Sequence, residues 1–152
     1  SMCAHPEDAE EFRQWPPHCV AGTFGQQKPA ATLVEKRAII PNGAAELGIE
    51  GAQPDGAQQI LVEKNDLDVF SNPNVNALLD KIGAVEFYVY GVFTEYCVDK
   101  AATGLLKRGG RVYIVSDAIC AVEESKGRRT MEAFTAAGGA MTTVRELTGA
   151  SL

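Results

Sequence analysis

AVEFYVYGVFTEYCVDKAATGLLKRGGRVYIV, residues 84–115, carries the strongest secondary-structure signal in this chain. Its first part, Val85–Val92, is an apolar, β-branched and aromatic run that is typical of a buried strand. Thr94–Arg108 has apolar side chains at helical spacing and ends at two glycines, which predicts a helix. Val112–Val115 is a further buried strand. A strand, a helix and a strand within about 30 residues form a βαβ unit, so the two strands are parallel.

The same alternation continues on both sides of this stretch. Ile60–Val62 is a short apolar run, and Asn74–Ile82 has the spacing of a helix that ends at Gly83. A polar helix is expected around Glu123–Ala137, and Met141–Val144 is a candidate last strand. The pattern predicts an α/β protein with a mostly parallel sheet covered on both faces.

The first 56 residues look different, because they hold six of the seven prolines and few periodic segments. We expect loops there, with one short strand at Thr32–Ile40 before a turn at Pro41. A length of 152 residues suits one domain, so residues 1–152 are interpreted as a single domain.

Charge and hydropathy exclude several functions. With 14 basic and 20 acidic residues the net charge is −6, which argues against binding to nucleic acid or to an anionic membrane surface. The longest apolar runs are far shorter than the roughly 18 residues of a membrane span. Ser1–Phe12 is acidic and polar, unlike a signal peptide. These features predict a cytoplasmic protein.

The four cysteines form no CxxC motif, so a zinc ribbon and a thioredoxin-type site are not indicated. Cys97 follows the strand that ends at Val92. If Thr94 caps the next helix, Cys97 lies in its first turn, where free N–H groups and the helix dipole favour a thiolate. The same N–H groups suit an oxyanion. The alternative is that Cys97 is a small buried apolar residue.

Three blocks, in order, resemble one family. They are Trp15-Pro16-Pro17-His18-Cys19-Val20-Ala21-Gly22-Thr23, then Val62-Glu63-Lys64 with Asp68-Val69-Phe70-Ser71, then Gly91-Val92-Phe93-Thr94-Glu95-Tyr96-Cys97-Val98. They are similar to segments of the isochorismatase-like cysteine hydrolases in their nicotinamidase form, and the resemblance runs from Cys3 to Thr148. It implies a three-layer α/β/α fold with a doubly wound sheet.

The resemblance also implies roles for individual residues. Cys97 would be the nucleophile, with Lys64 beside it to hold the thiolate. The N–H groups of Phe93 and Cys97 would form the oxyanion hole, next to a cis peptide between Val92 and Phe93. Trp15, Val92 and Phe93 would contact the substrate, with Trp15 as a flat apolar wall. The alternatives are a solvated Lys64 at a strand end and a Trp15 packed in the core.

His5 and His18 match metal ligands of the nicotinamidases, which implies a divalent zinc, iron or manganese ion and no organic cofactor. The alternative is two unrelated loop histidines. The family pattern has an Asp where this chain has Cys3, whose thiolate suits zinc. A third His found in some relatives has no match within Glu7–Gln14.

The family also uses an Asp at the end of its first strand as general base. No matching strand is found here, and neither Asp8, Asp66 nor Asp68 follows a comparable apolar run. We therefore expect a single domain that lacks the first strand, because it is truncated or naturally short or because another chain supplies the missing part. Without the general base, Cys97 would be reactive but turnover poor. An unpaired sheet edge favours association, and the resemblance implies a homo-oligomer.

The predicted function is hydrolysis of an aromatic carboxamide such as nicotinamide to the acid and ammonia, through a thioester on the cysteine. The substrate is a small molecule, and no nucleic acid or membrane partner is expected. Two alternatives remain. One is a related hydrolase acting on a different amide or on an isochorismate-like vinyl ether, and the other is a truncated, non-catalytic binding or scaffold protein.

Overall fold

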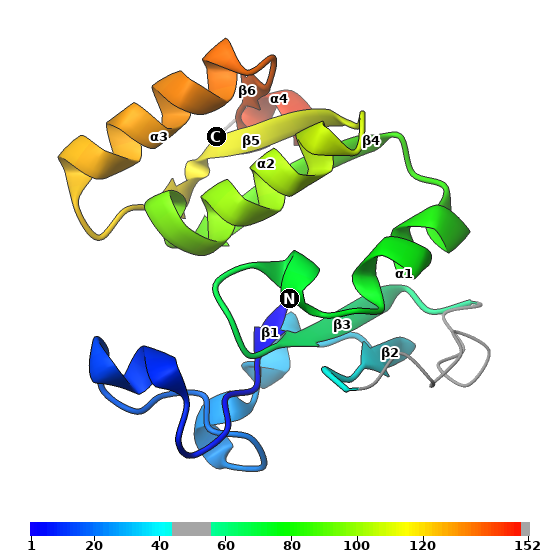
Figure 1. Cartoon of the computed structure of the whole chain (residues 1–152). Coiled ribbons are helices and arrows are strands. Elements are labelled where there is room, and N and C mark those ends of the chain that lie inside the picture. The colour runs from blue at the N-terminus through cyan, green and yellow to red at the C-terminus, as the bar shows by residue number, and fades with distance from the viewer. Residues whose placement is uncertain (44–55, 150–152) are drawn as a thin grey trace. The chain divides into compact units, whose positions relative to one another are not determined.

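The computed structural model describes residues 1–43 and 56–149 (Figure 1). The chain divides into two compact units, Ser1–Ile82 and Gly83–Leu152. Each unit contains its own parallel three-stranded sheet. The predicted α/β class with parallel strands and flanking helices is therefore confirmed. None of the helices within the described ranges is long and apolar enough to cross a membrane.

The first unit is built on β3 (Gln59–Lys64), which lies between β1 (Met2–Cys3) and β2 (Arg37–Ile40). In the register, Cys3 pairs with Lys64. Because both neighbours run parallel to β3, Lys64 lies at the carboxyl edge of this sheet, where parallel α/β sheets place their ligands.

The strand expected at Thr32–Ile40 begins only at Arg37. Ala30–Thr32 is a 3-10 turn instead, and the hydroxyl of Thr32 donates to the carbonyl of Pro29 at 2.8 Å. Such a local side-chain hydrogen bond competes with strand pairing, which shortens the strand.

A buried asparagine ties the end of β3 to the helix that follows. The amide nitrogen of Asn72 donates to the carbonyl of Glu63 at 2.7 Å, and its oxygen accepts the N–H of Asn74 at 2.9 Å. Helix α1 (Val75–Ile82) begins directly afterwards and buries Val75 and Leu78, as its apolar spacing predicts. The connections in this unit also contain the 3-10 turns Glu10–Arg13, Phe24–Gln26 and Val69–Ser71.

The second unit contains β4 (Glu86–Val92), β5 (Arg111–Cys120) and β6 (Ala140–Thr142) in that order. Helices α2 (Asp99–Lys107) and α3 (Glu124–Ala136) pack beside this sheet (Figure 1). They share one apolar core, made of Val98, Ala102, Val112, Ile114 and Phe134. Burial of each large apolar side chain contributes about 1.5–3 kcal/mol, so this cluster holds the βαβ unit together.

Several boundaries differ from the predicted ones. The helix expected over Thr94–Arg108 is divided into a π-helical turn, Thr94–Val98, and α2. A short helix that the sequence pattern did not indicate, α4 (Val144–Thr148), follows β6. It begins with a capping box, in which Thr143 and Glu146 exchange side-chain and backbone hydrogen bonds.

The pairing of β4 with β5 is interrupted by a bulge. Val89 pairs with Ile114, and the next pair is Gly91 with Ile119, so β4 advances two residues while β5 advances five. The residues in this bulge bond elsewhere. Ser116 donates to the carbonyl of Thr142 at 3.0 Å, and Asp117 accepts the N–H of Val144 at 2.9 Å.

Candidate functional site

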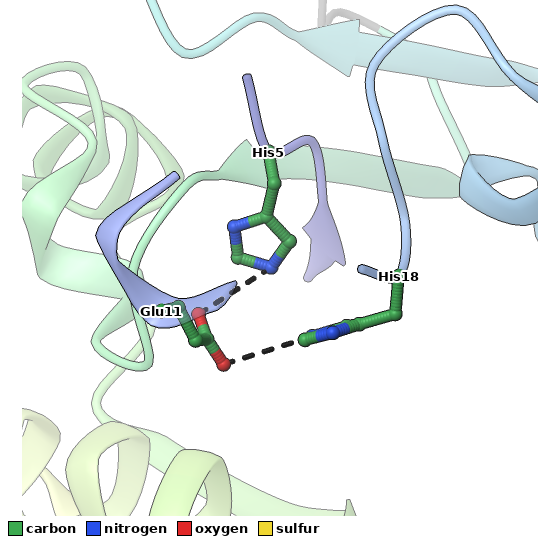
Figure 2. Close-up of side chains that lie close together, drawn as sticks. All are labelled: His5, Glu11 and His18. Carbon is green, nitrogen blue, oxygen red and sulfur yellow. Dashed lines mark ion pairs between the residues drawn. The ribbon is translucent and has the colours of Figure 1, made fainter. Parts of the chain in front are cut away.

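In the first unit, the side chains of His5, Glu11 and His18 converge (Figure 2). One donor atom from each lies within 4.8 Å of the others. Nε2 of His5 is 3.5 Å from Oε2 of Glu11, and Nε2 of His18 is 3.6 Å from Oε1 of the same carboxylate. The two predicted metal ligands therefore lie together, and Glu11 completes a set of three.

Backbone pairing brings these residues together. His5 forms a parallel bridge with Val20, its N–H donates to the carbonyl of Cys19 at 3.1 Å, and its carbonyl accepts from Ala21 at 2.8 Å. His18 is thereby held next to the segment that carries His5. Two adjacent acids lie in the 3-10 turn Glu10–Arg13, and the turn directs only one of them inward. The Glu11 side chain is 18% exposed, whereas that of Glu10 is 87% exposed.

His5 is completely buried, and neither of its ring nitrogens has a hydrogen bond of good geometry in the described part of the chain. The ring lies near the carbonyl of Asn65 and edge-on to Phe12. Burial lowers the pKa of His5, and the Glu11 carboxylate offsets only part of this effect. The ring is therefore neutral, and a cation bound at the ring nitrogen that carries the lone pair would satisfy one of the two buried nitrogens, each of which costs about 1–3 kcal/mol when unpaired.

His18 is oriented by a second hydrogen bond. Its Nδ1 lies 2.8 Å from the carbonyl oxygen of Pro16. Since a carbonyl can only accept, Nδ1 carries the proton, and the lone pair of neutral His18 is on Nε2, the atom nearer Glu11. Two imidazole nitrogens and a carboxylate fit zinc, iron or manganese.

Cys3 is not a member of this cluster, although the missing family Asp made it a candidate for the carboxylate's place. Glu11 provides the carboxylate instead. Burial raises the pKa of the Cys19 thiol, and the influence of Cys3 raises it further. The sequence interpretation missed Glu11 because it looked for a histidine in residues 7–14, a segment with four acidic residues.

Trp15 lies in the segment that joins Glu11 to His18. It is half-buried, and its backbone N–H donates to the carbonyl of Glu11 at 3.0 Å. The alternative that Trp15 packs in the core stays open. Its contact with a substrate stays a prediction.

Lys64 is 3% exposed, so the alternative of a solvated lysine is also wrong. Its Nζ donates to the carbonyl of Asp66 at 2.6 Å. A buried ammonium needs partners in a low-dielectric setting, which is typical of a lysine with a specific role. Lys64 belongs to the first unit and Cys97 to the second, and their pairing stays a prediction.

Cys97 lies in the π-helical turn that directly follows β4, and it is half-buried. The prediction that Thr94 caps this turn is wrong. Phe93 is the cap residue, with its carbonyl accepting from Tyr96 at 3.1 Å and Val98 at 3.2 Å, while Thr94 is 2% exposed and points inward. The turn is a π-turn, which is wider than an α-turn, and its first helical residue is therefore one position earlier in the sequence than predicted.

The expected cis peptide between Val92 and Phe93 is present. Both side chains remain exposed, Val92 by 61% and Phe93 by 41%. They are therefore available to a ligand at the carboxyl end of β4. The nucleophilic role of Cys97 and the oxyanion role of the Phe93 and Cys97 N–H groups stay predictions.

Glu95, inside the same turn, is a structural residue that the motif did not reveal. Its carboxylate accepts the N–H of Glu123 at 2.8 Å and that of Val122 at 3.0 Å. Burial raises the pKa of Glu95, but these N–H groups outweigh burial and leave it below the ordinary value.

Comparison with known proteins identifies the class to which this fold and these residues belong. The family model of the isochorismatase domain matches residues 4–146. The chain belongs to the isochorismatase family, as its three motif blocks predict.

Individual relatives are more distant. The chain is 38% identical over 63 residues to streptothricin hydrolase of Streptomyces noursei, which covers 41% of this chain and 23% of that protein. It is 32% identical over 71 residues to nicotinamidase 3 of Arabidopsis thaliana, covering 47% and 36% respectively. The chain thus matches only about a quarter to a third of these curated relatives.

The pyrazinamidase of Pyrococcus horikoshii, solved in complex with zinc, superposes with a TM-score of 0.72 at 25% identity. The superposition covers 93% of this chain and 72% of that one. The chain therefore has the fold of the isochorismatase-like hydrolases, as predicted from the sequence.

Proposed function

We propose that this protein hydrolyses an aromatic carboxamide such as nicotinamide, yielding the acid and ammonia. The observation that carries this proposal is the His5–Glu11–His18 cluster, in which the buried His5 ring has no hydrogen bond of good geometry to the described residues and can offer one nitrogen to a metal ion. Membership of the isochorismatase family and the likeness to a nicotinamidase and a pyrazinamidase support it.

In this proposal the Cys97 thiolate adds to the carboxamide carbon, and the N–H groups of Phe93 and Cys97 stabilise the oxyanion. The C–N bond then breaks, the leaving nitrogen takes up the proton that the thiol lost on forming the thiolate and departs as ammonia, and a thioester remains. Water hydrolyses the thioester and restores the thiol. Lys64 supplies a positive charge that favours the thiolate.

His5, Glu11 and His18 would hold a divalent cation, which would supply a Lewis-acid position for the ring nitrogen of the substrate. Trp15 would pack against one face of the aromatic ring, and Val92 and Phe93 would line the opening beside Cys97. These groups orient the carboxamide carbon toward the sulfur, which is the positional contribution to the rate.

The test is ammonia release from nicotinamide and from benzamide, which has the same shape but lacks the ring nitrogen. Cys97→Ala should abolish release, and Glu11→Gln should reduce it for nicotinamide more than for benzamide. Cys120→Ser and Glu10→Gln are matched controls and should behave like wild type. Equal release by wild type and Cys97→Ala would reject the enzyme proposal.

The second candidate is a hydrolase for a different amide or for an isochorismate-like vinyl ether. The match to streptothricin hydrolase supports this second candidate. A metal-loaded protein that leaves nicotinamide intact but releases amine or pyruvate from another substrate in a Cys97-dependent way would select it. Light scattering on the same samples tests the expected homo-oligomer.

A further inference from the structure

The candidate metal cluster is accompanied by a side chain that offers no ligand atom, that of Phe12. Its ring centroid lies 5.6 Å from that of His5 and 5.5 Å from that of His18, with interplanar angles of 68° and 62°. Both pairs have the edge-to-face geometry that aromatic rings prefer at centroid separations of about 4.5–7 Å. The two imidazoles also meet edge-on, at 4.9 Å and 68°. Phe12 therefore packs against both of the nitrogen donors.

The 3-10 turn Glu10–Arg13 positions Phe12 together with the carboxylate of the cluster. The backbone N–H of Phe12 donates to the carbonyl of Ala9 at 3.0 Å, and the carbonyl of Glu11 accepts the backbone N–H of Trp15 at 3.0 Å. The Phe12 side chain is half-buried. One turn of the backbone thus brings both the acidic ligand and the aromatic ring to the two histidines.

The two histidines differ in what fixes the plane of the ring. In His18, Nδ1 lies 2.8 Å from the carbonyl oxygen of Pro16, and this bond restricts rotation of the imidazole. His5 is completely buried, yet neither of its ring nitrogens has a hydrogen bond of good geometry to the described residues. A metal-binding histidine ordinarily has its second nitrogen hydrogen-bonded to an oxygen, which sets the ring orientation. Since the described residues give His5 no such bond, packing against neighbouring rings must set the orientation of its imidazole.

We propose that Phe12 is a positioning residue for the metal cluster, because its edge-on contacts fix the planes of both imidazoles and keep both Nε2 atoms turned toward Glu11. This inference deepens the proposed function and rests on it, since it requires the cluster to bind a divalent cation. Phe12 offers no ligand atom, so it acts through the two histidines. Donors that are oriented before the cation arrives lose less conformational freedom on binding, which raises the affinity for the metal.

The experiment is a calorimetric titration of the metal-free full chain with zinc, together with visible absorption spectra of the same variants loaded with cobalt(II). Phe12→Leu keeps an apolar side chain but removes the ring. It should weaken zinc binding by about tenfold, which is the lower end of the loss seen when a ligating histidine loses its supporting partner. The absorption bands of bound cobalt should shift as well, because the donors are no longer held in one geometry. Phe12→Tyr keeps the ring and should retain the wild-type affinity and spectrum.

Phe24→Leu is the matched control, because it is the same substitution in the same unit at a side chain that is 87% exposed, and it should bind zinc like wild type. The melting temperatures of the metal-free variants show whether each chain is folded. If Phe12→Leu does not fold, Phe12→Met is the second variant without a ring and should show the same loss of affinity.

The outcomes separate this proposal from the proposed function. Wild-type zinc affinity and an unchanged cobalt spectrum in folded Phe12→Leu would overturn the role of Phe12 and leave the metal cluster and the hydrolase proposal standing. Equally weak binding by Phe12→Tyr and Phe12→Leu would also overturn it, because the ring would then not be the feature that matters. A wild-type chain that binds no zinc and no cobalt would reject the metal cluster itself, and the role of Phe12 with it.

Discussion

The carboxylate of Glu95 accepts the backbone N–H of Glu123 at 2.8 Å, across the short loop that connects β5 with α3. A second bond, from the N–H of Val122, reaches the same oxygen at 3.0 Å. The turn that carries Cys97 is thus tied to the start of α3 through a single side chain two residues away. Its geometry depends on this link as well as on the core beneath it.

Replacing Glu95 by Ala should destabilise the protein by about 1–2 kcal/mol, because two backbone N–H groups lose a charged acceptor and must be satisfied by water. Chemical denaturation measures the loss. Glu132→Ala, on the exposed surface of α3, is the control and should stay within about 0.5 kcal/mol of wild type. Equal stability of the two variants would show that the link is not a determinant of the turn.

The same carboxylate should make stability depend on pH. The folded-state pKa of Glu95 lies below the ordinary 4.5, with the N–H groups of Glu123 and Val122 outweighing burial. Its contribution is therefore present above pH 4.5 and is lost as the pH falls through the folded-state pKa. The difference in melting temperature between wild type and Glu95→Gln should shrink over that acidic range. A constant difference between pH 7 and pH 3 would contradict the assignment.

Metal binding should stabilise the protein through the cluster. At a hundredfold excess over the dissociation constant, zinc should add about 2.7 kcal/mol of stability, provided that it binds the folded state alone. Glu11→Gln should remove most of this gain, while Glu10→Gln, one residue away and exposed, should keep it. Calorimetric unfolding with and without chelator is the measurement. A gain that persists in Glu11→Gln would place the ion elsewhere.

Gly127→Ala should destabilise the second unit although it lies inside helix α3. An alanine normally improves a helix interior by about 1 kcal/mol over glycine. Here the new Cβ would lie 2.6 Å from the Cβ of Ala121, so the loop before α3 must shift. We expect a net loss of about 1–3 kcal/mol from this overpacking. The double variant Ala121→Gly, Gly127→Ala frees the space and should recover part of the loss.

The regular parts of the fold follow from sequence patterns because each is a local signal. The spacing of Val75, Leu78 and Ile82 predicts α1, and the apolar run up to Val92 predicts β4. The π-helical turn at Thr94–Val98 does not follow from such a pattern. The apolar residues of this turn are spaced as in an α-helix, so their pattern does not distinguish a π-turn from an α-turn. The difference between the two arises where β4 leads into the turn.

The candidate site was predictable in part. His5 and His18 stand out as the two histidines of the chain, and a motif marks each of them. Glu11 could not be selected from sequence alone, because Glu10 is equally acidic and only the 3-10 turn decides which side chain faces inward.

The bulge between β4 and β5 separates strand β5 into two halves with different neighbours. Its first half carries Val112 and Ile114 of the apolar core. After the bulge, Ile119, which packs against the same core, and Cys120 pair with the residues that lead into the Cys97 turn. Thermal fluctuations of the second half can therefore be decoupled from global unfolding. Amide hydrogens there should exchange with solvent sooner than those of Val112 and Ile114, which would make the end of the sheet next to the Cys97 turn the more flexible one.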